Sequence, residues 1–168
     1  MTGATGRFDE KQDSCTKGQS NPKRLRRSFL VVICCKQRTA RTIVEMREKI
    51  AIVDDEPGVL RALKRLVEAN GFTTQVYASG EDFICDSLED VACAILDVNL
   101  GGMSGIEAGR RLAANHIDIP VIFITAQDSP IVHKEAMELG CSAYLRKPFL
   151  GDSLIGAVRN AVLESHHK

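Results

Sequence analysis

The sequence of 168 residues lacks any long uninterrupted hydrophobic stretch. Its longest apolar run, residues Phe29–Cys35, spans seven residues, whereas a membrane-spanning helix needs about 20. The sequence therefore predicts no transmembrane helix and no membrane partner. Apolar residues still make up 44% of the chain and charged residues 26%, which excludes a wholly disordered chain and indicates one folded domain with an appendage.

Cysteines with metal-binding or redox spacing are also missing. No two of the six cysteines form a CxxC motif, and none has a histidine at ligand spacing. The pattern indicates neither a zinc site nor a disulfide framework, so we expect reduced thiols and a cytoplasmic location. The cysteines are Cys15, Cys34, Cys35, Cys85, Cys93 and Cys141.

The chain has no net charge, but its two parts carry opposite charges. Residues 1–45 contain ten Lys or Arg against four Asp or Glu, whereas residues 46–168 contain 12 against 18. The first part is rich in small and polar residues, shows no period of helix or strand, and includes the basic run Lys23–Arg27. We therefore predict that residues 1–45 form a disordered basic extension.

A domain boundary is expected at Met46, where the sequence Met-Arg-Glu-Lys-Ile-Ala-Ile-Val-Asp-Asp begins like a compact domain. Two interpretations of residues 1–45 follow. A functional basic tail would bind nucleic acid or an anionic membrane surface, because Lys and Arg pair with phosphate groups. Alternatively, the segment is upstream sequence included through a mis-assigned start codon, and the protein proper occupies residues 46–168.

Short apolar runs alternate with segments of helical spacing from residue 49 onward. The runs predict strands at 50–53, 72–77, 92–96, 121–124 and 142–145. Helices are predicted over 59–67 before Asn70-Gly71, after a Ser79 cap, over 106–113, over 132–139 before Gly140, and along the stripe Leu150, Leu154, Val158 and Val162. Because the strands are apolar nearly throughout, we predict an α/β fold, a doubly wound five-stranded parallel sheet with five helices.

Polar side chains of reactive types follow four of the five predicted strands. They are Asp54, Asp55, Asp97, Thr125 and Lys147. In a doubly wound sheet, ligands bind beyond the carboxyl ends of the strands, so these side chains are expected at one shared edge. Three neighbouring carboxylates raise one another's pKa unless a cation lies among them. A hard cation with few protein ligands fits that need, Mg²⁺ before Ca²⁺.

Thr125 and Lys147 are not required by a plain metal site. A phosphoryl group on an aspartate has anionic oxygens that a metal ion, an ammonium group and a hydroxyl donor can each bind. The set therefore suits an acyl phosphate on Asp97. Singly, each residue also has a structural interpretation, such as a helix cap for Asp55 or Thr125, but their convergence at one edge favours the shared site.

Four motifs carry a resemblance to a known family. They are Ile-Val-Asp54-Asp55-Glu-Pro, Leu-Asp97-Val-Asn99-Leu-Gly-Gly-Met-Ser-Gly, Ile-Thr125-Ala and Tyr144-Leu-Arg-Lys147-Pro-Phe. The region of residues 49–164 resembles the receiver domain of two-component response regulators, most closely those of the FixJ type. This resemblance implies phosphorelay signal transduction and a sheet with the strand order 2-1-3-4-5. It also implies that the domain is a signalling switch with no enzymatic turnover beyond its own phosphorylation and dephosphorylation.

The resemblance assigns the phosphoacceptor and the metal ligands. Asp97 would take a phosphoryl group from a sensor histidine kinase or a histidine phosphotransfer protein. Asp55 and Asp97 would bind Mg²⁺ directly, Asp54 through water and Asn99 through its backbone carbonyl. Gly101 departs from the family, which commonly has Pro at that position, and predicts a more mobile loop.

The resemblance also implies a switch. Lys147, across a cis bond to Pro148, would pair with phosphoryl oxygens, and Thr125 would move to hydrogen-bond another of them. Tyr144 would then turn inward as the switch aromatic residue. The helix 4 to helix 5 face would be repacked, and a phosphorylation-dependent homodimer through this face is a further hypothesis.

Other interpretations remain open. An aspartyl-nucleophile phosphohydrolase would need an acid two residues after the nucleophile, where this chain has Asn99. A flavin-binding module would need a Gly-rich phosphate loop in place of Asp-Asp-Glu-Pro, and a phosphate-independent binding module would keep the carboxylates only as a polar rim. Only residues 165–168 follow the last predicted helix, so we expect no DNA-binding domain in this chain. It would be a stand-alone receiver or a truncated relative of a transcription factor.

Overall fold

The structure is a computed structural model that describes residues 48–127 and 129–165. The prediction for residues 1–45 lies outside the described residues. Strands and helices alternate along the described chain. They are β1 (Lys49–Val53), α1 (Pro57–Ala69), β2 (Thr73–Tyr77), α2 (Gly80–Cys85), β3 (Val91–Asp97), α3 (Gly105–Ala114), β4 (Val121–Thr125), α4 (Pro130–Glu138), β5 (Ala143–Arg146) and α5 (Gly151–Ser165).

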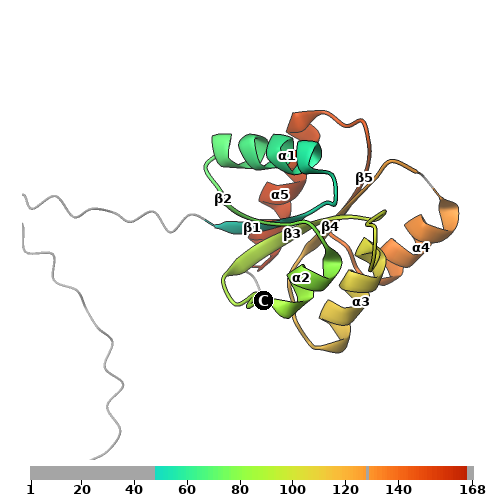
Figure 1. Ribbon diagram of the computed structural model, residues 1–168. Coiled ribbons are helices and arrows are strands. Elements are labelled where there is room, and N and C mark those ends of the chain that lie inside the picture. The colour runs from blue at the N-terminus through green and yellow to red at the C-terminus, as the bar shows by residue number, and fades with distance from the viewer. Residues whose placement is uncertain (1–47, 128, 166–168) are drawn as a thin grey trace, which may run out of the picture. The chain divides into compact units, whose positions relative to one another are not determined.

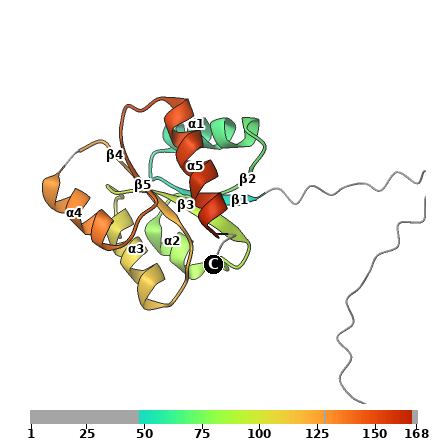
Figure 2. The ribbon, with the colours of Figure 1, turned by 180° about the vertical axis from the view of Figure 1, so that it is seen from behind.

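The five strands form one parallel sheet in the order β2-β1-β3-β4-β5 (Figure 1). Helices α1 and α5 cover one face of the sheet and helices α2, α3 and α4 cover the other, as the two opposite views show (Figures 1 and 2). The predicted doubly wound fold and its strand order are thus confirmed. The order reverses between β1 and β3, which places the crevice for ligands at the carboxyl ends of these two strands.

The core lies on both faces of the three inner strands. The β1 residues from Ile50 to Val53 are completely shielded from solvent, and the edge strand β2 is more exposed. On one face Phe83 and Phe123 pack with α3, and on the other Leu154 packs with α1 and the sheet. This burial on both faces explains why the inner strands are apolar without alternation. Within the described residues, no helix combines the length and the apolar character needed to cross a membrane.

The predicted helix ends are confirmed where a local signal set them. Ser79 Oγ accepts a hydrogen bond from Asp82 N at 3.1 Å, so Ser79 is the N-cap of α2. Asn70 ends α1, and Gly71 follows with a φ of +94°, a conformation that a residue without a side chain adopts at little cost. Gly140 follows α4 in the same way.

One part of the predicted apolar stripe is wrong. Leu154, Val158 and Val162 are buried as predicted, but Leu150 is 76% exposed and precedes α5. The carbonyl of Leu150 accepts a hydrogen bond from Leu154 N at 3.3 Å, so this residue flanks the helix. A residue in that position does not follow the helical face, and its side chain faces solvent. The Lys147-Pro148 bond just upstream is cis, as the resemblance implies.

Candidate functional site at the carboxyl ends of the strands

Three carboxylates meet where β1 and β3 end side by side. Val53 of β1 pairs with Leu96 of β3, and the next residues along the two strands carry the acids. One carboxylate oxygen from each of Asp54, Asp55 and Asp97, here called the acidic cluster, lies within 4.8 Å of the others. Asp54 is fully buried, Asp97 is 6% exposed and Asp55 faces solvent. The predicted convergence of these residues is confirmed.

Lys147 brings a positive charge to the acidic cluster from the end of β5. Its Nζ lies 2.7 Å from Asp54 Oδ2 and 3.3 Å from Asp97 Oδ2. The backbone N of Lys147 donates a hydrogen bond to the carbonyl of Thr125 at 2.7 Å, which fixes where the side chain starts. Burial disfavours the charged ammonium group, but the hydrogen bond to Asp54 and the two carboxylate charges outweigh it and raise the pKa of Lys147.

Asp54 orients Lys147 and the start of α1. Its Oδ2 accepts the hydrogen bond from Lys147, and its Oδ1 accepts one from the backbone N of Glu56 at 2.9 Å. Glu56 is the N-cap of α1, and neither its own side chain nor Asp55 caps that helix. Asp55 is therefore not a helix cap. Its carboxylate is the exposed member of the acidic cluster.

One carboxylate oxygen of Asp97 is suited to binding a cation. Its Oδ1 is buried, and no residue in the described part of the chain donates a hydrogen bond to it. Burial raises the pKa of Asp97 and the charge of Asp54 raises it further, whereas the ammonium group of Lys147 and a backbone hydrogen bond from Asn99 to the carboxylate lower it without cancelling the rise. A buried carboxylate oxygen without a donor is costly. The residues therefore fit a hard divalent cation, whose preferred ligands are oxygens of this kind.

Thr125 lies at the end of β4 and is completely buried. Its Oγ1 donates a hydrogen bond to the Gln127 carbonyl at 2.8 Å and accepts bonds from Gln127 N at 3.1 Å and Asn99 Nδ2 at 3.2 Å. Helix α4 begins later, at Pro130, so Thr125 does not cap it. The side-chain contact of Asn99 was missed by the sequence analysis, because no local pattern joins residues 26 positions apart.

Tyr144 lies on β5 and packs against α4. Its ring meets the ring of His133 edge-on, with centroids 4.8 Å apart and planes at 84°. Tyr144 is half-buried, and its hydroxyl oxygen is shielded from solvent. The structure thus places the predicted switch residue between the end of the sheet and the helix that follows Thr125. Its movement remains a prediction.

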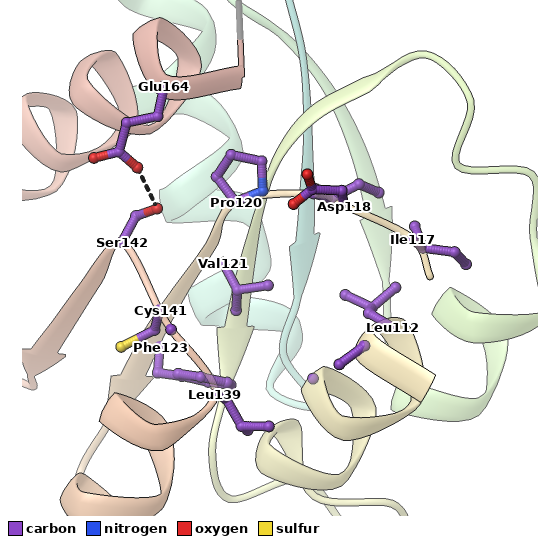
Figure 3. A pocket seen from close by; sticks show the side chains of 14 residues that line it. Leu112, Ile117, Asp118, Pro120, Val121, Phe123, Leu139, Cys141, Ser142 and Glu164 are labelled. Carbon is purple, nitrogen blue, oxygen red and sulfur yellow. Dashed lines mark hydrogen bonds between the residues drawn. The ribbon is translucent and has the colours of Figure 1, made fainter. Parts of the chain in front are cut away.

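A separate cavity of about 310 Å³ lies at the opposite edge of the sheet, where β4 and β5 begin (Figure 3). Leu112 of α3, Val121 of β4 and Leu139 after α4 line it, and Ser142 donates a hydrogen bond to Glu164 at its rim at 2.9 Å. None of the predicted site residues belongs to this cavity. The candidate site is therefore the acidic cluster with Lys147, Thr125 and Asn99.

An acidic cluster of two buried aspartates and one exposed aspartate, with an adjoining lysine at the carboxyl edge of a β2-β1-β3-β4-β5 sheet, defines a receiver-type α/β domain. The family model described as the response regulator receiver domain matches residues 50–159. The chain belongs to this family, whose domains serve phosphorelay signalling. The family assignment from the four sequence motifs is confirmed.

Named relatives are response regulators. The chain is 36% identical to the response regulator protein TmoT of Ectopseudomonas mendocina over 114 residues, which cover 67% of this chain and 52% of TmoT. It is 32% identical to the transcriptional regulatory protein CreB of Escherichia coli, with 67% and 50% covered. The chain thus spans about half the length of these curated relatives. The crystal structure of FixJ-N is similar with a TM-score of 0.64 and 31% identity, over 68% of this chain and 93% of FixJ-N.

Proposed function

We propose that Asp97 accepts a phosphoryl group from the phosphohistidine of a sensor histidine kinase or a histidine phosphotransfer protein. An Asp97 carboxylate oxygen attacks the phosphorus atom, the P–N bond to the histidine breaks, and the imidazole nitrogen keeps that electron pair. The position of the Lys147 ammonium group carries the proposal. It lies 3.3 Å from Asp97 Oδ2, beside the buried Oδ1 that lacks a donor among the described residues.

The neighbouring residues have separate roles in this proposal. Lys147 pairs with a phosphoryl oxygen, and Asp54 keeps the ammonium group oriented through its 2.7 Å hydrogen bond. The donors for Mg²⁺ are the carboxylates of Asp55 and Asp97 and the backbone carbonyl of Asn99, with Asp54 acting through water. When bound, Mg²⁺ neutralises negative charge on the carboxylates and the phosphoryl oxygens.

The phosphohydrolase alternative is not favoured. Such an enzyme needs an acid two residues after its nucleophile, and that position is Asn99, whose side-chain amide donates to Thr125 Oγ1 at 3.2 Å. The N–H groups of a neutral amide donate hydrogen bonds but are far too weakly acidic to protonate a leaving group. The domain is therefore proposed as a switch whose only reactions are its own phosphorylation and dephosphorylation.

The switch is proposed to begin at Thr125. Its hydroxyl now donates to the Gln127 carbonyl and would have to leave that acceptor to reach a phosphoryl oxygen. Tyr144 is then expected to move with respect to His133, which alters the face formed by α4, β5 and α5. This face is proposed to meet a partner, and a second phosphorylated copy of the chain is one candidate.

The phosphodonor is proposed to dock beside Lys147. An apolar groove of about 300 Å³ lies there between α1 and the loop that enters α5, lined among others by Val59, Leu66 and Phe149.

We also propose that residues 46–168 are the receiver unit and residues 1–45 a separate extension. A cytoplasmic location is part of the proposal, supported by the free thiols of Cys85, Cys93 and Cys141.

The test is intact-mass measurement after incubation with Mg²⁺ and acetyl phosphate or phosphoramidate. We expect one added phosphoryl group on the wild-type chain, none on Asp97→Ala and none in the presence of a chelator. The matched control is Asp82→Ala, an exposed acid on α2, which should be phosphorylated normally. Phosphorylation that persists in Asp97→Ala, or a wild-type chain that stays unmodified by both donors and by a purified histidine kinase, would overturn the proposal.

A further inference from the structure

The loop between the end of β3 and α3 contains two adjacent glycines, Gly101 and Gly102, and therefore has little rigidity of its own. Near its start lies Asn99, the residue proposed to offer a backbone carbonyl to the cation. The start of α2 lies directly against its far end, since a Cβ on Gly80 would be only 3.0 Å from the Met103 carbonyl oxygen. A hydrogen bond from Gly105 N to the Val98 carbonyl at 3.2 Å closes the loop at its base, and contacts with neighbouring elements can restrain the glycines between them.

Glu81 supplies such a restraint from the first turn of α2. Its Oε1 accepts a hydrogen bond from the backbone N of Met103 at 2.7 Å, across 22 residues of sequence. The same carboxylate lies against Gly102, where an added Cβ would be 2.8 Å from Oε1. Met103 is 9% exposed, so this bond lies next to the core. The Ser79 cap fixes the turn from which Glu81 projects.

The other side of the loop faces the acidic cluster. A Cβ on Gly101 would lie 3.3 Å from Asp55 Oδ2, which puts the loop backbone in close contact with a proposed cation ligand. The loop therefore spans the distance between Glu81 and Asp55. A change in the position of the loop would move both the Asn99 carbonyl and the Gly101 backbone beside Asp55.

We infer that Glu81 is a positioning residue that holds the 99–103 loop for cation binding at the acidic cluster. The inference rests on the proposed function, because it assumes that the cluster binds Mg²⁺. Glu81 does not touch the cation in this inference. It orders a Gly-Gly loop in advance, so less conformational entropy is lost when the cation binds.

The test uses the whole chain and measures Mg²⁺ affinity by isothermal titration calorimetry. Glu81→Ala removes the acceptor, and we expect Mg²⁺ to bind about three- to tenfold more weakly, because part of the free energy of the lost hydrogen bond is coupled to cation binding. Glu81→Gln keeps a carbonyl oxygen for Met103 N and should bind nearly as the wild type does. Asp82→Ala removes the same charge from the next residue on the helix and should also bind normally.

Amide hydrogen exchange in the absence of Mg²⁺ tests the order of the loop independently of cation binding. The amide of Met103 should exchange its hydrogen faster in Mg²⁺-free Glu81→Ala than in Mg²⁺-free wild type, while its exchange in Asp82→Ala stays unchanged. Gly102→Ala perturbs the same contact from the loop side and should weaken Mg²⁺ binding as well. In the double variant with Glu81→Ala the added methyl group no longer meets the carboxylate, so the two effects should not add.

Each contrary result has a distinct meaning. If Glu81→Gln binds Mg²⁺ as weakly as Glu81→Ala, charge and not the hydrogen bond is responsible, and the inference is wrong. Equal affinity of all variants and wild type overturns the inference and leaves the proposed function intact. A wild-type chain that does not bind Mg²⁺ overturns the proposed function and the inference with it.

Discussion

Lys147 donates a hydrogen bond to Asp54 at 2.7 Å across 93 residues of sequence. The Asp54 side chain is only 1% exposed, and that of Lys147 is 21% exposed, so the pair is held at the rim of the acidic cluster. The contact holds the ammonium group 3.3 Å from Asp97 Oδ2. The charges of Lys147, Asp54 and Asp97 therefore affect both the reactivity of the site and the stability of the folded domain.

The carboxylate of Asp97 is expected to lower the stability of the Mg²⁺-free domain at neutral pH. Burial and the charge of Asp54 raise its pKa above the ordinary value of 3.8, so the folded state holds the proton more tightly than the unfolded state. Stability contributed by the protonated form is therefore lost as the pH rises from 3.8 through the folded-state pKa. Asp97→Asn should unfold at higher urea concentration than wild type at pH 7.

The same experiment at acidic pH is the control, because the advantage of Asp97→Asn should shrink once Asp97 is protonated in the wild type. Asp54 still pairs with Lys147 in the variant, so the result does not depend on breaking that pair. An equal difference in the free energy of unfolding at both pH values would contradict the pKa direction.

Mg²⁺ is expected to stabilise the folded wild-type chain. A ligand that binds only the folded state adds about 1.4 kcal/mol to the free energy of unfolding at ten times its dissociation constant. Asp55→Asn should lose most of this gain while changing the metal-free stability little, because Asp55 faces solvent. Thermal unfolding with and without Mg²⁺ measures the effect, and Asp82→Asn is the matched surface control. An undiminished shift of Tm in Asp55→Asn would remove Asp55 from the ligand set.

Thr125→Ala is expected to uncouple phosphorylation from the conformational response. The hydroxyl group holds Gln127 and Asn99, so its loss should destabilise the domain by about 1–2 kcal/mol. Asp97 should still be phosphorylated, but the NMR shifts of residues on α4 and β5 should no longer respond. Thr125→Ser keeps the hydroxyl group and should restore the response. A full response in Thr125→Ala would show that the switch does not start at this residue.

Gly105 is expected to tolerate no side chain. It begins α3, and a Cβ there would overlap the backbone carbonyl of Asp97. Gly105→Ala should destabilise the fold by about 3 kcal/mol and displace the end of β3. Gly156, in α5, has open space around its Cβ position, so Gly156→Ala should instead stabilise the domain by up to about 1 kcal/mol. Urea unfolding compares the two, and equal effects would contradict the packing described at Gly105.

Phosphorylation is expected to cause dimerisation through the α4, β5 and α5 face. Ile131 on α4 is 71% exposed and gives this face an apolar contact point. Light scattering should show a doubled mass after addition of a beryllofluoride phosphate mimic with Mg²⁺, and Ile131→Lys should prevent it. The wild-type mass without the mimic is the control. A mass that does not change with the mimic would exclude this dimer.

Most of the fold could be predicted because its signals are local. Apolar runs of strand length, helical spacing, the Ser79 cap and the glycines at helix ends each depend on residues within a few positions of one another. Leu150 shows the limit of such reasoning, since it has the right spacing for α5 and is nevertheless 76% exposed. Spacing does not reveal where the first helical residue lies once the chain arrives from an irregular loop.

The sequence by itself determined which side chains share the candidate site. Asp54 and Lys147 directly follow strands, and Asp97 and Thr125 are the last residues of theirs. Parallel strands bring these carboxyl ends to one edge of the sheet. Only the tertiary structure decided which atoms meet. The bonds from Lys147 to Asp54 and from Asn99 to Thr125 join residues 93 and 26 positions apart, and the bond from Glu81 to Met103 joins two elements that pack on one another. Such contacts depend on strand register and helix placement, which the packing of the whole core sets and no local pattern encodes.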